Sequence, residues 1–187
     1  MSENSSSFFD ELRDAARGFI ALLLGNRQAA THFDFSQRGL AGSFIAFLLA
    51  SALGAWGGHL FGLQSPPGAA TQGLIVGAVL FLVQMGVSYL VLRQMGRLDG
   101  FVPFLVADNW VTLFTSIAAL LLLGLGGPND IIIIAIGIVV IVVEVNIARL
   151  IVTLAPLQIA MFIGAQLVAT VIGMVLLGGS LPAPPPA

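Results

Sequence analysis

The chain has 187 residues and contains neither cysteine nor lysine. Without cysteine it forms no disulfide, holds no thiolate-bound metal and has no cysteine nucleophile. Only 9% of its residues are charged, whereas roughly 25% is usual in soluble domains. So few charges do not cover the surface of a domain that is dissolved in water. The composition therefore excludes a soluble enzyme, a disordered chain and a nucleic-acid-binding protein.

Apolar residues make up 58% of the chain, and the mean hydropathy is +1.03. No charged residue occurs from Gly39 to Leu92, a stretch too long for one crossing of about 20 residues, and a Pro-Pro pair breaks it. The apolar stretch after Asp130 is broken near Pro156, which predicts a very short turn at residues 153–156. A lone strand in lipid would leave its backbone unpaired, so these segments should be helices. We predict an all-α membrane protein with five transmembrane helices, at about 39–62, 71–92, 101–124, 131–152 and 156–178.

An amphipathic helix is expected over residues 7–25, ahead of the first span. Ser7 and Asp10 have the spacing of a capping box, and Gly25 supplies a stop. Apolar residues recur at helical spacing on one face (Phe8, Leu12, Ala16, Phe19 and Leu23), and charged residues gather opposite (Asp10, Arg13, Asp14 and Arg17). Such a helix lies on the membrane surface or packs against the bundle. The alternative is a docking helix for a partner protein.

All seven arginines fall on one side of a five-span arrangement. Four precede the first span, two lie between the second and third spans, and Arg149 is near the end of the fourth. The positive-inside rule therefore predicts a cytoplasmic N-terminal segment (1–38), a five-helix domain (39–178) and a Pro-rich periplasmic tail (179–187). The expected location is a bacterial inner membrane, with the lipid bilayer as the main surroundings.

Three ionisable residues fall within the predicted spans, namely Asp108, Glu144 and Arg149. Such residues are costly in lipid and are functional candidates by default. With Asn109 and Asn146 they form a candidate intramembrane polar cluster in the cytoplasmic half, where Arg149 either snorkels or reaches a carboxylate. Two interpretations stay open: a polar contact that locks the third and fourth spans together, or the proton- or ion-linked site of a small transporter. A third is an arginine site for lipid head groups.

Small residues recur at every fourth position in three of the spans. They are Gly42, Ala46, Ala50, Gly54 and Gly58 in the first span, Gly73 and Gly77 in the second, and Ala165, Ala169 and Gly173 in the fifth. This spacing predicts close helix packing within the chain, or between subunits. Polar residues also follow stripes: Asp108, Thr112 and Thr115 in the third span, and Gln84 and Ser88 in the second. They line a polar pathway or bond to neighbouring helices.

No catalytic motif, cofactor-binding motif or metal-ligand spacing occurs in the sequence. The order of a cytoplasmic N-terminal segment, five spans and a short tail on the far side resembles the Yip1-like superfamily over about residues 39–178. It is also similar to small five-span proteins of alphaproteobacteria. The resemblance implies a membrane-organising or partner-binding protein. We therefore expect a non-enzymatic scaffold or accessory subunit, with a membrane-protein partner or a second copy of the chain. The alternative is a small transporter or channel.

Overall fold

The computed structural model describes residues 7–62, 66–127 and 129–180, and every element in these residues is helical. The longer helices are α1 (Phe8–Leu23), α2 (Gln37–Trp56), α3 (Ala69–Gln94), α4 (Phe101–Gly126), α5 (Asp130–Asn146) and α6 (Pro156–Ser180). The short ones are η1 (Ala29–His32), η2 (Gly57–Phe61), η3 (Leu98–Gly100) and the π-helical η4 (Ile147–Ile151). Most of the predicted Pro-rich tail lies outside the described residues.

Five of the described segments are long and apolar enough to cross a membrane. They are Gln37–Phe61, Ala69–Gln94, Leu98–Gly126, Asp130–Ile151 and Pro156–Leu177. Each lies within a few residues of a span predicted from the sequence, so the predicted number and position of the apolar helices are confirmed. Together they indicate a multi-pass membrane protein.

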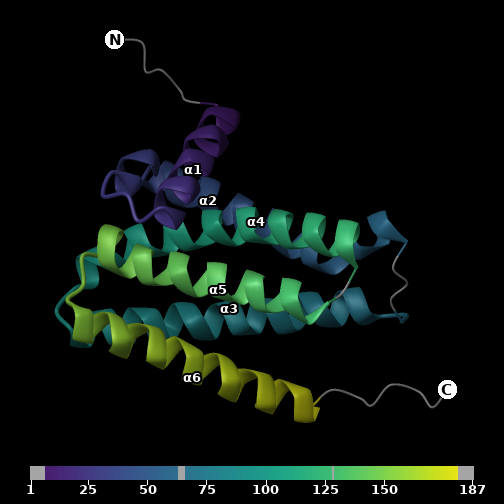
Figure 1. The fold of residues 1–187 in the computed structure, drawn as a ribbon. Coiled ribbons are helices and arrows are strands. Elements are labelled where there is room, and N and C mark those ends of the chain that lie inside the picture. The colour runs from purple at the N-terminus through teal and green to yellow at the C-terminus, as the bar shows by residue number, and fades with distance from the viewer. Residues whose placement is uncertain (1–6, 63–65, 128, 181–187) are drawn as a thin grey trace.

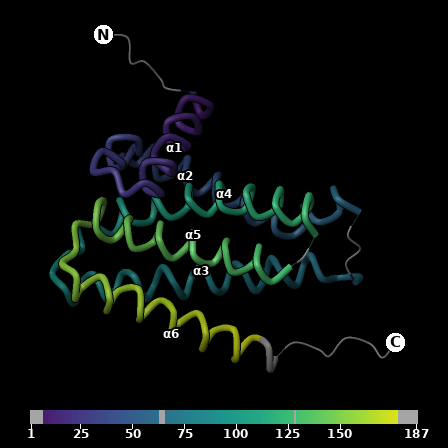
Figure 2. Tube along the Cα trace, in the orientation of Figure 1, coloured from purple at the N-terminus to yellow at the C-terminus, as the bar shows by residue number. Residues whose placement is uncertain are grey.

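The five apolar helices run alternately in opposite directions and form one bundle (Figures 1 and 2). The α3–α4 connection and the α5–α6 turn lie at one end, and the α4–α5 connection lies at the other. We call the first of these the arginine end, because it carries Arg38, Arg93, Arg97 and Arg149. Within the bundle α2 packs chiefly against α4, and α3 packs chiefly against α6.

Helix α1 begins and ends with the capping signals that its sequence contains. The Ser7 hydroxyl accepts from a first-turn N–H, and the Asp10 carboxylate accepts from the Ser7 N–H at 3.0 Å, which completes the predicted capping box. At the other end Gly25 has φ +64°, and the Asn26 N–H donates to the Ala21 carbonyl at 2.8 Å. This is the left-handed glycine cap that ends many helices.

Helix α1 is docked against the bundle, chiefly on α4 and α5 and to a smaller extent on α2 (Figure 1). The Phe8 ring lies 5.7 Å from the Trp110 ring, and the Phe19 ring lies 5.6 Å from that of Phe114. These aromatic pairs tie both ends of α1 to α4, since such contacts add to the area that they bury. The charged side of α1 is exposed, and its members are Asp10, Arg13, Asp14 and Arg17.

The fourth apolar span ends in a stretch of π-helix, whose turns are wider than those of the α-helix that the sequence predicts. Its last residues form the π-helical η4, in which the Val152 N–H donates to the Ile147 carbonyl at 3.0 Å. The chain then turns within residues 152–155 and re-enters helix at Pro156, so the predicted short turn is confirmed. Thr153 has φ +58°, a left-handed conformation that is uncommon for a β-branched residue.

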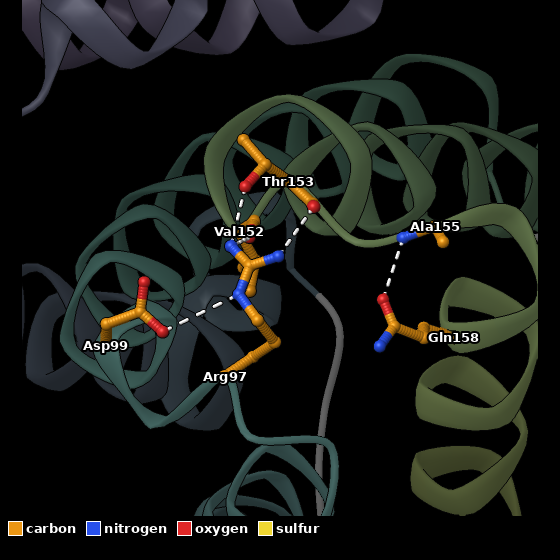
Figure 3. A network of polar contacts seen from close by, with 6 residues as sticks. All are labelled: Arg97, Asp99, Val152, Thr153, Ala155 and Gln158. Atoms are coloured by element: carbon orange, nitrogen blue, oxygen red, sulfur yellow. Dashed lines mark hydrogen bonds and ion pairs between the residues drawn. The ribbon is translucent and has the colours of Figure 1, made fainter.

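An arginine from the α3–α4 connection holds this turn (Figure 3). The Arg97 guanidinium donates to the carbonyl oxygens of Val152 and Thr153, at 2.6 and 2.8 Å, and to the Thr153 hydroxyl at 2.6 Å. Its Nε atom lies 3.6 Å from an exposed Asp99 carboxylate oxygen. A planar guanidinium can make several such bonds at once, so Arg97 fixes the strained turn between the last two spans.

Candidate functional site

The structure brings two of the predicted polar residues together. Helix α4 presents Asp108 and α5 presents Glu144, and their carboxyl groups lie close enough to interact directly on the wall of one cavity. Because an ionised carboxylate only accepts, a hydrogen bond between two carboxyl groups needs a proton on one of them. The Oε2 atom of Glu144 is buried and has no hydrogen-bond partner in the described part of the chain. Two facing carboxyl groups that are shielded from water do not both ionise readily, so one shared proton suits the pair, and Glu144 Oε2 stays free as an acceptor within the described residues.

The other predicted members of the cluster lie elsewhere. Asn109 is buried and donates to the Ser43 hydroxyl at 3.1 Å, whereas Asn146 donates to the Leu22 carbonyl in the last turn of α1 at 2.8 Å. Arg149 is exposed at the arginine end, and no salt bridge within the described residues joins it to a carboxylate. Neighbouring residues on a helix point about 100° apart, so Asp108 and Asn109 face different helices.

A cavity of about 420 Å³ lies beside the carboxyl pair, and all five apolar helices contribute to its lining. Its polar lining residues are Gln84 on α3, Asp108, Thr112, Thr115 and Ser116 on α4, Glu144 on α5, and Gln166 and Thr170 on α6. The polar stripe that the sequence places on the third span therefore faces this cavity. Its volume falls within the range of about 300–1,000 Å³ that is typical of small-molecule sites. We call this space the central cavity.

Toward the arginine end, a layer of packed side chains borders the central cavity. Leu92, Ile147 and Phe162 have no exposed surface, and the Phe162 ring meets that of Phe104 edge to face at 5.0 Å. At the same level, the Gln166 amide on α6 donates to the buried Ser88 hydroxyl on α3 at 3.3 Å. The polar stripe on α3 thus bonds to α6 at this level, which is the helix–helix contact that the sequence allowed.

Away from the arginine end, the central cavity adjoins a groove of about 400 Å³ between α2 and α3. Gly77 lines both spaces, and Gly54 and Gly73 line the groove. A Cβ atom added at any of these three glycines would meet no atom within 4 Å. They therefore border open space and make no close helix–helix contact within the part of the chain that the structure describes. Phe47 and Phe81 stack at 3.9 Å beside the junction of the two spaces.

The remaining small residues of the predicted stripes pack within the chain to different degrees. Ala46 and Ala50 are buried in α2, Gly173 is buried against Leu80, and Gly58, Ala165 and Ala169 are half-buried. Gly42 is buried too, but a Cβ atom there would lie 2.5 Å from Oε1 of Glu11 on α1. Gly42 therefore lets the Glu11 carboxylate of α1 approach α2 closely.

Glu11 is a residue that the sequence did not single out. Burial of its carboxyl group raises its pKa above the usual value, and the nearby Asp34 carboxylate raises the pKa further. Arg38 and the Trp110 side chain act in the opposite direction on this pKa. Glu11 is thus a partly desolvated acid at the contact between α1 and the bundle.

Two further residues of the central cavity, Gln166 and Thr170, were also missed. They are four positions apart on α6, and this spacing on an apolar helix is a signal that could have identified them. No cluster of three or more metal-binding side chains is found among the residues that the structure describes. Comparison of the chain with protein-family models, with curated proteins and with solved structures gave no match.

Proposed function

We propose that the protein is a small membrane carrier that moves protons by way of the Asp108–Glu144 pair. The observation that carries this proposal is the contact between two carboxyl groups, from two helices, on the wall of a cavity lined by five apolar helices. Ionisable side chains within spans commonly mark proton or ion pathways. A pair that shares one proton can accept a second one and release it again.

The main alternative for these residues is a structural lock between α4 and α5. A lock gives no account of the unpartnered Glu144 Oε2 atom or of the open volume beside it. Asn109 and Asn146 make packing contacts of this kind without bordering the central cavity, although the Oδ1 atom of Asn109 is also buried without a partner in the described residues. The free acceptor and the adjoining space favour proton exchange.

Proteoliposomes with a pH-sensitive dye inside test the proposal. Under an imposed pH gradient, wild-type protein should dissipate the gradient faster than empty liposomes do. Glu144→Gln should slow this flux by about tenfold or more, because one member of the pair then no longer ionises. Asp130→Asn is the matched control, since this carboxylate is exposed on the same helix and outside the central cavity. Equal flux through empty and wild-type liposomes would refute a proton carrier.

The proposed orientation places the arginine end in the cytosol, and the C-terminal tail in the periplasm. Its support is the location of Arg38, Arg93, Arg97 and Arg149 at one end of the bundle, since arginine is enriched on the cytoplasmic side. In this orientation the layer of packed side chains lies between the central cavity and the cytosol, and the groove between α2 and α3 leads toward the periplasmic side. A reporter that is active only in the periplasm, fused to the C-terminus, tests the orientation.

A second candidate function is that of a scaffold or accessory subunit, in line with the Yip1-like resemblance. It is favoured by three large apolar side chains on and just after α1 that point away from the bundle, namely Phe9, Ile20 and Leu24. We propose that α1 lies in the membrane interface, where these residues contact lipid or a partner helix. A photo-crosslinking residue at Phe9 in native membranes distinguishes the two, since a scaffold yields a protein adduct there.

A further inference from the structure

The described residues that line the central cavity include two carboxyl groups and no cationic side chain. Of the described residues that line it, Asp108 and Glu144 carry the titratable groups, and α2, α3 and α6 supply apolar, amide and hydroxyl side chains. A pair that shares one proton carries one negative charge, and an uncompensated charge in a low-dielectric interior is costly. The site becomes neutral with a second proton, or with one monovalent cation.

The hydrogen-bonding groups of the lining define which cation fits. The amide of Gln84 donates to the Thr170 hydroxyl at 3.1 Å, and that hydroxyl donates to the Gln166 backbone carbonyl at 2.9 Å. The Thr115 hydroxyl donates to a carbonyl of its own helix at 2.7 Å. The Thr115 and Thr170 hydroxyls and one N–H of the Gln84 amide are thus used within the described residues, where Oε2 of Glu144 is an acceptor without a donor. This acceptor can take an N–H group from a ligand, which a primary ammonium supplies and a quaternary ammonium does not.

Most of the remaining lining is apolar and suits a hydrocarbon body next to the charge. Phe47, Phe81 and Phe104 border the space, together with aliphatic residues that include Leu80 and Ile163. Aromatic faces attract cations, and the aliphatic residues favour the burial of apolar surface. The lining thus combines one anionic end with an apolar remainder.

We infer that the central cavity binds a small primary ammonium compound with an apolar body, which exchanges for one proton at the Asp108–Glu144 pair. The inference rests on the proposed carrier function and names its substrate class. In the exchange the ammonium N–H donates to Glu144 Oε2, one proton leaves the doubly protonated pair, and the other proton stays between the two carboxyl groups. Charge is conserved, because one cation enters as one proton departs.

Isothermal titration of the full-length protein in detergent with phenethylammonium tests the inference. Titrations in two buffers of different ionisation enthalpy give the number of protons released, which should be about one for each cation bound. Glu144→Gln should weaken binding by about tenfold or more, because a charge-assisted hydrogen bond is lost. 2-Phenylethanol, which has the same body without the charge, and the trimethylammonium analogue, which has no N–H, should bind at least about tenfold more weakly.

Two glycines supply a matched pair of variants that leave the carboxyl groups intact. Gly77 and Gly73 lie one turn apart on α3, both with open space around a Cβ atom, but Gly77 alone of the two lines the central cavity. Gly77→Leu should therefore abolish phenethylammonium binding, whereas Gly73→Leu should leave it unchanged. This pair keeps the test decisive should Glu144→Gln fail to fold.

The outcomes separate this inference from the carrier function. Phenethylammonium binding that depends on Glu144 and on Gly77, in a protein that moves no protons in liposomes with or without phenethylammonium, would support the binding site and refute the carrier. Proton flux that depends on Glu144, without phenethylammonium binding, would overturn the inference and leave the carrier in place. Equal affinity for 2-phenylethanol, or equal affinity of the Gly77→Leu and Gly73→Leu variants, would also overturn it.

Discussion

Removal of the Arg97 side chain should destabilise the contact between the last two apolar spans. Arg97 joins the α3–α4 connection to the α5–α6 turn by hydrogen bonds to two carbonyl oxygens and one hydroxyl. Arg97→Ala leaves these acceptors without their charged donor, next to a left-handed Thr153 that the bonds hold in place. The variant should therefore unfold more easily than the wild type, with the α5–α6 turn affected first.

The magnitude follows from how exposed each bond is. A hydrogen bond to a charged group contributes about 1.5–3 kcal/mol when buried. Here the side chain of Arg97 is 28% exposed, the bond to the Val152 carbonyl is partly buried, and the two bonds to Thr153 are exposed. Taking about 1.5 kcal/mol for the first bond and less than about 1 kcal/mol for each exposed one gives a total of about 2–3 kcal/mol.

Unfolding in a detergent mixture with increasing SDS, followed by the fluorescence of the buried Trp110, measures this loss. Asp99→Asn is the control, because its ion pair is long and its side chain is 75% exposed, so it should cost less than about 0.5 kcal/mol. Arg97→Lys should give an intermediate loss, since it keeps the charge without the planar set of donors. If Arg97→Ala costs no more than Asp99→Asn, the turn is not held by these bonds and the reasoning is wrong.

Three further predictions concern the contacts around α1 and η2. Burial raises the pKa of Glu11, so docking of α1 should be strongest below the usual carboxyl pKa and weaken as the pH rises through the raised pKa. Hydrogen exchange of the α1 amides measures this dependence on pH, and Glu11→Gln should flatten it. Asn146→Leu removes the bond to α1 and should cost about 1–2 kcal/mol, seen as faster exchange in the last turn of α1. Gly57→Val places a Cβ atom 2.8 Å from Leu120 and should cost about 1–3 kcal/mol in SDS unfolding, whereas Gly54→Ala meets no atom and serves as its control.

The helices of the bundle could be predicted from the sequence because the requirements on them act along a single segment of the chain. A segment in lipid must be apolar for about 20 residues and must satisfy its own backbone, so hydropathy and the positions of proline locate it. The signals that end α1, Ser7 at one end and Gly25 at the other, act within a few residues and are equally local. The π-helical η4 could not be predicted, since its wider hydrogen bonds depend on the turn that Arg97 holds from another part of the chain.

The sequence could identify candidate residues for the site, but it could not predict which of them are in contact. Hydropathy identifies Asp108 and Glu144 as unusual, but their contact depends on the rotation of α4 and α5 about their own axes and on which helices are neighbours. Sequence spacing gives the face of a helix and not its partner, which is why Arg149 entered the predicted cluster although it is exposed at the arginine end. Glu11 was missed because its burial depends on Gly42, which lies on a different helix.

The polar residues within the spans divide into two kinds, and this division supports a functional site. Asn109 and Gln166 each donate a hydrogen bond to a serine on a neighbouring helix, and such bonds hold transmembrane helices together. Asp108 and Glu144 interact with each other and line the central cavity. The unpartnered Glu144 Oε2 atom therefore belongs to a residue that borders open volume, whereas the unpartnered Oδ1 atom of Asn109 does not. A packing contact has no need of two acidic groups where one amide would suffice, since the acids add the cost of charge in lipid. The carboxyl pair is therefore better explained by the exchange of protons or cations than by the cohesion of the bundle.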